Sequence, residues 1–89
     1  MKLFHIPKIE CTTGSLLRFI TDDDGLHYAE YTFEADGILH SAVDKQSAEK
    51  VYGRELTEEL LDMLLPKEVT VYYDAKNLDD SKPDLINFD

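Results

Sequence analysis

Val69-Thr70-Val71-Tyr72-Tyr73-Asp74 is the stretch of sequence that decides the fold. β-Branched and aromatic residues dominate it, as they do in strands. Alternation places its three odd-numbered residues on one face and its three even-numbered residues, Asp74 among them, on the other. The segment 75–83 that follows is acidic, and we expect it to form a turn. The pattern therefore predicts a short β-strand whose odd-numbered side chains enter the core, with the remaining strands paired around it.

Asp36-Gly37 is the strongest local signal in the chain, because this dipeptide favours a two-residue hairpin turn of the primed type. It joins the well-alternating segment 27–35 to a second extended segment, 38–43. Such a turn fixes the register of the two strands, so Phe33 lies opposite His40. We therefore expect His40 to pack in the core against an aromatic ring, and a pH-sensing role for its ring is the alternative.

The segment 9–21 also reads as extended, and Gly14 within it is typical of a bulge or a sharp curl. Strict alternation puts Leu17 and Phe19 on one face, which we expect to be the core face, and Leu16 on the other. Because both faces are partly apolar, we expect this strand to curl around the core.

A helix is predicted after residue 56. Thr57 is suited to be its N-cap, and Glu58 and Glu59 fall in the first turn, where the helix dipole favours acidic residues. Leucines at helical spacing form an apolar stripe, and Pro66 ends the helix. We expect it to cover one side or end of the sheet. The segment 44–53 before it is polar and weakly helical.

These patterns predict one small domain over residues 1–89, since a chain of this length holds a single thin core. The fold class is mainly β (α+β): a small curled antiparallel sheet or half-barrel of four to five strands with one packed helix. The tail, 82–89, adds a short edge strand or frays. The predicted core consists of Leu17, Phe19, Tyr31, Phe33, Leu60, Leu64, Val69, Val71 and Tyr73.

The charge is strongly acidic: 19 Asp and Glu against 9 Lys and Arg give a net charge of −10. Such a surface repels phosphate groups, so we expect no direct contact with nucleic acid or anionic lipid. Its first interpretation is a solubilising surface. The alternative is an acidic inhibitor that mimics nucleic acid and occupies a basic protein, which requires the carboxylates to gather in one exposed double row.

The location predicted from the sequence is the cytoplasm. A single cysteine, Cys11, has no internal disulfide partner, as is usual in a reducing compartment. No apolar run approaches the ~18 residues that span a bilayer. The start of the chain also lacks the apolar region of a signal peptide.

Patterns for catalysis and metal binding are weak. Asp22-Asp23-Asp24-Gly25 lacks the alternating acids and the distal Glu of a calcium loop. The histidines show no ligand spacing with Cys11. Cys11, His40 and Asp44 form the most tempting nucleophile, base and acid, but no local motif accompanies them. We therefore expect no catalytic residue, no metal and no cofactor, and keep a small hydrolase as the third hypothesis.

The candidate interaction surface is carried by Tyr28, Tyr52 and Tyr72, which fall on faces predicted to be partly exposed. Tyrosine is favoured at protein interfaces, although the three rings equally suit the second face of a small curled sheet. An exposed edge strand offers another route, by pairing with its copy in a homodimer. We therefore expect, first, a non-catalytic protein-interaction or structural module that binds a protein partner or itself.

Two blocks of the sequence resemble a bacterial family known only as domain of unknown function 3592. Residues 31–40 look like its aromatic strand, Asp-Gly turn and returning strand, and residues 69–77 look like its "V-x-V-x-Y-[DN]-P-x-N-P" ending. Ala75 and Leu78 stand where the family usually has proline, and His40 where an aromatic is usual. The resemblance implies a divergent member with a small β domain. It implies no activity, and the transmembrane helices common in that family are not expected here.

Overall fold

The computed structural model describes residues 8–51 and 53–85, except for the side chain of Leu64. Five strands in this part of the chain form one antiparallel sheet in the order β3-β2-β1-β6-β7, and two short strands form a separate hairpin. The elements are β1 (Ile9–Thr21), β2 (His27–Ala35), β3 (Ile38–Val43), β4 (Lys50–Val51), β5 (Arg54–Glu55), α1 (Glu58–Leu64), β6 (Lys67–Asp74) and β7 (Asn77–Pro83).

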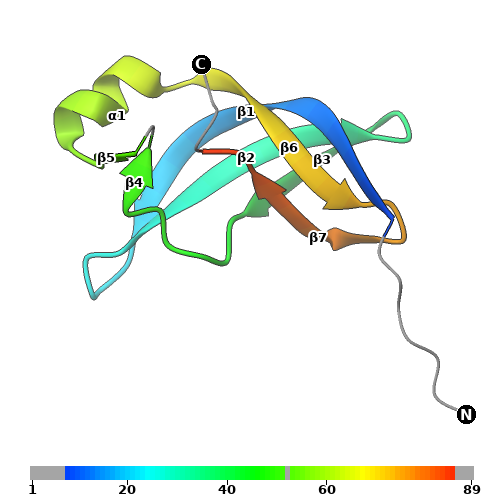
Figure 1. Cartoon of the computed structure of the whole chain (residues 1–89), viewed down its shortest axis with the longest axis horizontal. Helices are drawn as coiled ribbons and strands as arrows, with labels where there is room; N and C mark the ends of the chain where they lie inside the picture. The colour runs from blue at the N-terminus through cyan, green and yellow to red at the C-terminus, as the bar shows by residue number, and fades with distance from the viewer. Residues whose placement is uncertain (1–7, 52, 86–89) are drawn as a thin grey trace, which may run out of the picture.

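The large sheet curls into a half-barrel, which confirms the predicted fold class. Its two edge strands are β3 and β7. Figure 1 shows the helix α1 and the β4–β5 hairpin together at one end of the sheet. Leu60 of α1 and Val51 of β4 are buried in the same hydrophobic cluster as the sheet residues, so these elements cover that end of the core.

The strand at the centre of the sheet is β1, which corrects the expectation that the other strands pair around residues 69–74. The first part of β1, from Ile9 to Leu16, pairs with β6, and the later part, from Gly14 to Thr21, pairs with β2. With 13 residues, β1 is long enough to serve both neighbours. Because β6 pairs with the first part of β1 and β2 with the later part, these two strands diverge from one another, and the sheet curls.

Gly14 lies where β1 is paired on both sides, opposite Phe33 of β2 and Val69 of β6. A Cβ atom at this position would lie 2.2 Å from the carbonyl oxygen of Thr32 and 2.8 Å from Cγ2 of Val71. No side chain fits at such distances. Glycine is therefore required here by the close approach of neighbouring strands.

A β-bulge at Leu17 changes which side of β1 faces the core. The register with β2 shifts between Leu16 and Arg18, so one additional residue reverses the alternation from this point on. Leu16 is fully buried, Leu17 is 40% exposed, and Phe19 is partly buried against the core. The prediction of Leu17 as a core residue was wrong, and Leu16 takes its place.

Most of the remaining predicted core is confirmed. The side chain of Leu64 lies outside the described part of the chain. Six of the predicted residues are in the buried cluster: Tyr31, Phe33, Leu60, Val69, Val71 and Tyr73.

The β2–β3 hairpin has the predicted register, with Phe33 opposite His40. Asp36 and Gly37 both have positive φ, at 55° and 78°, as a primed two-residue turn requires. The half-buried His40 ring stacks on Phe33 with a centroid distance of 5.3 Å.

The described residues of the segment 44–53 are not helical, contrary to expectation: they cross to one end of the sheet and include β4, which pairs with β5. Two backbone hydrogen bonds account for this. The Ala48 N–H donates to the carbonyl of His27, and the Leu56 N–H donates to the carbonyl of Glu49 at 3.0 Å. These non-local bonds outweigh a weak helical propensity.

The predicted acidic turn after β6 is a two-residue turn followed by β7, so the edge strand begins earlier than expected. The final residues, 86–89, lie outside the described part of the chain.

Asp74 is fully buried, although alternation placed it on the outer face. Its Oδ1 accepts hydrogen bonds from the backbone N–H groups of Lys8, at 3.2 Å, and Lys76, at 2.9 Å. The register of β6 with β7 also shifts between Tyr73 and Asp74. The carboxylate therefore stabilises the β6–β7 turn against the start of β1, a contact that alternation along β6 does not reveal.

The helix α1 begins as predicted, because Oγ1 of Thr57 accepts a hydrogen bond from the Leu60 N–H at 3.2 Å. It ends at Leu64, two residues before Pro66. Among the described residues, no helix has the length and apolar character needed to cross a membrane.

Candidate interaction surface

The strand β3 is an open edge of the sheet, with β2 on one side. The Asp44 N–H, just beyond β3, donates to the carbonyl of Ala29 at 2.8 Å. In an antiparallel ladder, residues that direct both backbone groups toward the paired strand alternate with residues that direct both away from it. The bond from Asp44 therefore shows that the even-numbered residues of β3 bond to β2. The N–H and C=O groups of Leu39, Ser41 and Val43 therefore point away from β2. Outside the strand ladders, no backbone hydrogen bond between described residues involves these three.

The side chains of β3 are apolar and exposed. Ile38 is 61% exposed, Leu39 69% and Val43 45%. The strand also contains no charged residue and no proline, in a chain of which 31% is charged. Natural edge strands usually carry lysine, proline or a bulge that prevents another strand from pairing with them. The described β3 residues carry none of these features.

The opposite edge, β7, carries several of them. Its sequence contains Asp79, Asp80, Lys82 and a terminal Pro83, and its pairing with β6 is irregular. It is also tied to the interior, because the Oη of Tyr31 lies 2.6 Å from Oγ of Ser81 across the concave side of the sheet. The two edges of the half-barrel therefore differ, and β3 is the one open to another strand.

Tyr28 lies on the outer face of β2, opposite Ile20 of β1. It is half-buried. Burial raises the pKa of its hydroxyl, and a hydrogen bond with the Asp22 carboxylate raises it further. Tyr28 therefore has a structural contact with the β1–β2 turn.

Tyr72 lies on the same outer face of the sheet, opposite Cys11 of β1, and is 38% exposed. Cys11 and Ile20, the partners of Tyr72 and Tyr28, are separated by roughly 30 Å along β1. The third candidate, Tyr52, lies outside the described residues. The structure therefore does not bring Tyr28 and Tyr72 together into one patch.

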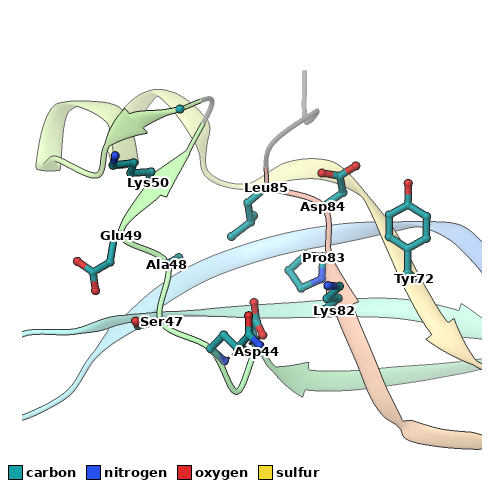
Figure 2. A pocket seen from close by; sticks show the side chains of 12 residues that line it. Asp44, Ser47, Ala48, Glu49, Lys50, Tyr72, Lys82, Pro83, Asp84 and Leu85 are labelled. Carbon is teal, nitrogen blue, oxygen red and sulfur yellow. Dashed lines mark hydrogen bonds between the residues drawn. The ribbon is translucent and has the colours of Figure 1, made fainter.

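A groove of about 660 Å³ runs between the segment 44–50 and residues 82–85. Figure 2 shows Pro83 and Leu85 on one side of it and Ala48 to Lys50 on the other, with Tyr72 at the margin. Its lining combines carboxylates and lysines with a few apolar residues, and no histidine or cysteine is among the described residues that line it.

The tempting catalytic set is not assembled. Cys11 is exposed on the part of β1 that pairs with β6, opposite Tyr72. His40 lies on β3, beyond β2, stacked on the core residue Phe33. The described residues also contain no group of three or more His, Cys, Asp or Glu side chains placed to hold a metal ion.

Comparison with known proteins gives no relative: no family, no curated protein and no solved structure matches the chain. The resemblance to domain of unknown function 3592 stays a prediction.

The sequence did contain a sign of the open edge. The stretch from Ile38 to Val43 lacks charge and proline, which separates it from the other long strands among the described residues. Its meaning depends on β3 being an edge strand, and the order of the strands became known only with the structure.

Proposed function

We propose that this protein is a non-catalytic interaction module that binds an extended polypeptide strand at the β3 edge by β-strand addition. The observation that carries the proposal is the row of outward-facing backbone groups at Leu39, Ser41 and Val43, accompanied by exposed apolar side chains. An added strand satisfies those groups and covers those side chains at the same time.

The distribution of acidic residues favours this function over that of an acidic inhibitor. Carboxylates lie in the β1–β2 turn at 22–24, on α1 at Glu58, Glu59 and Asp62, and on β7 at 79–80, and Asp74 is buried. A nucleic-acid mimic needs one exposed row of negative charge, whereas these groups are on separate elements. The separation of Cys11 from His40 likewise supports a non-catalytic role over that of a small hydrolase.

The free thiol of Cys11 is exposed on β1. Exposed unpaired cysteines suit reducing compartments, and this supports a cytoplasmic site of action.

The experiment that tests the proposal compares the wild-type protein with Ser41→Pro and Ser41→Ala as baits in cells, followed by mass spectrometry of captured proteins. Proline at 41 removes an outward N–H that the β2–β3 ladder does not use, so the fold tolerates it at an edge. Alanine keeps that N–H and is the matched control. We expect the wild-type and Ser41→Ala baits to capture the same protein, whether another protein or a tagged second copy, and Ser41→Pro to lose it. Equal capture by all three folded baits would exclude the β3 edge.

A further inference from the structure

We infer that the strand received at this edge is β3 of a second copy, in an antiparallel pair related by a twofold axis. The inference rests on the proposed function and goes further, because it names the partner and the register.

The register follows from the backbone groups that face outward. Within β3, all of which is described, Leu39, Ser41 and Val43 present both an N–H and a C=O away from β2. Antiparallel pairing uses all of these groups when Ser41 lies opposite Ser41 of the second copy. Leu39 then lies opposite Val43 of the second copy, and the reverse pair forms on the other side of the axis. Each of these three pairs exchanges two hydrogen bonds.

Neighbouring registers are poorer. A shift by two residues leaves two such pairs and places a serine opposite Leu39 or opposite Val43, depending on the direction of the shift. A shift by one residue places each residue with outward backbone groups opposite a residue of the second copy whose backbone groups already bond to its own β2. It also turns the side chains of the second strand to the other face of the sheet. The centred register is therefore the one that satisfies the most backbone groups.

The side chains agree with this register. On the outer face, it sets Leu39, 69% exposed, beside Val43 of the second copy, 45% exposed, on both sides of the axis. The small Ser41 side chains meet at the axis itself. Apolar cross-strand pairs of this kind stabilise antiparallel sheets.

The local charge at this edge is compatible with a second copy, although the net charges of the two chains repel each other. Each copy carries −10, yet β3 from Ile38 to Val43 is uncharged, so the two acidic molecules meet where charge is lowest. Just beyond the strand, the same register places exposed Lys45 of one copy at the level of Gly37, next to the exposed Asp36, of the other. Opposite charges therefore approach at both ends of the interface.

The salt dependence distinguishes this partner from a basic one. Repulsion between two chains of net charge −10 is screened as ionic strength rises, so the dimer should strengthen with salt. A complex with a basic protein should weaken instead. A single pair of short edge strands is a small interface, and we expect dissociation in the micromolar range.

The test is sedimentation equilibrium of the wild-type protein from micromolar to submillimolar concentration, in about 20 mM and about 500 mM NaCl. We expect a monomer–dimer equilibrium that is tighter at high salt. Ser41→Pro and Leu39→Lys should each weaken it by roughly tenfold or more, the first by removing a donor and the second by charging the edge. Ser41→Ala and Ile20→Lys, the latter at an exposed position of central β1, should leave it unchanged.

Three results would overturn the inference. They are a wild-type protein that is monomeric at every concentration, a dimer that Ser41→Pro and Leu39→Lys leave intact, and a dimer that salt dissociates. The first of these, together with capture of a different protein that Ser41→Pro abolishes, would remove the second copy as partner and leave the proposed function standing.

Discussion

Two adjacent leucines of β1 have opposite environments. Leu16 is fully buried between β2 and β6, whereas Leu17 is left out of the ladder by the bulge and is 40% exposed. Alternation along the sequence assigns them the other way round, because a bulge inserts one residue without leaving a clear local signal.

Alanine substitutions test this assignment. Leu16→Ala should lower the free energy of unfolding by about 2–5 kcal/mol, because it leaves a cavity in the core. Leu17→Ala should lower it by less than about 1 kcal/mol, because that side chain is already partly in water. Urea denaturation measures both, and equal losses, or a larger loss for Leu17→Ala, would show that the bulge is misplaced.

Tyr31 is the residue that joins distant strands, through its hydrogen bond to Ser81 on β7. Burial raises the pKa of its hydroxyl above the ordinary value of 10.0, while the Ser81 hydrogen bond lowers it in part. The folded protein therefore favours the neutral phenol. The stabilisation is fully present below the pKa of the unfolded chain, and it is lost as the pH rises through the higher folded pKa.

The pH dependence of stability measures this effect. Wild-type stability should fall as the pH rises above about 10. Tyr31→Phe should cost about 1 kcal/mol at neutral pH through the lost hydrogen bond, and its decline above pH ~10 should be shallower. Ser81→Ala is the control: it loses the same hydrogen bond but keeps the buried phenol and hence the steep decline. Identical pH profiles for wild type and Tyr31→Phe would contradict the assignment.

Among the elements, β1 determines the curvature of the sheet, because its first half pairs with β6 and its second half pairs with β2. Gly14 allows both neighbours to approach at the point where the two halves overlap. The space available there, rather than any unusual φ angle, makes glycine necessary.

Gly14→Ala tests that point of contact. Its methyl group would meet the Thr32 carbonyl oxygen, so the strands must separate locally, at a cost of about 1–3 kcal/mol or more. Thr13→Ala, at the adjacent exposed position, should change stability by no more than ~0.5 kcal/mol. Chemical denaturation of both variants gives the comparison, and a Gly14→Ala protein as stable as wild type would refute the close approach.

The elements that could be predicted from sequence are those set by local chemistry. Asp36-Gly37 determined the β2–β3 turn and register, and Thr57 determined the start of α1. The β4–β5 hairpin and the burial of Asp74 depend on bonds to residues far away in the chain, such as His27 and Lys8, so no local pattern revealed them.

For the whole molecule, the decisive property is the difference between its two sheet edges. β7 is charged, irregular and tied to the core by Ser81, whereas β3 is uncharged and open. The sequence predicted that an exposed edge strand could pair with another strand, but the interaction surface it indicated by residue was carried by three tyrosines. Which strand lies at an edge is a consequence of strand order, a global property that pairing along the whole sheet decides.

Amide hydrogen exchange of β3, followed residue by residue by NMR at low and high protein concentration, tests the central claim most directly. In dilute solution, the N–H groups of His40 and Ala42 should be protected by β2, while those of Leu39, Ser41 and Val43 should exchange rapidly. In concentrated solution, the latter three should become protected as a second strand pairs with them. Two results would contradict an open edge that receives a strand. One is protection of all five N–H groups in dilute solution. The other is rapid exchange of Leu39, Ser41 and Val43 at every concentration and with any captured partner bound.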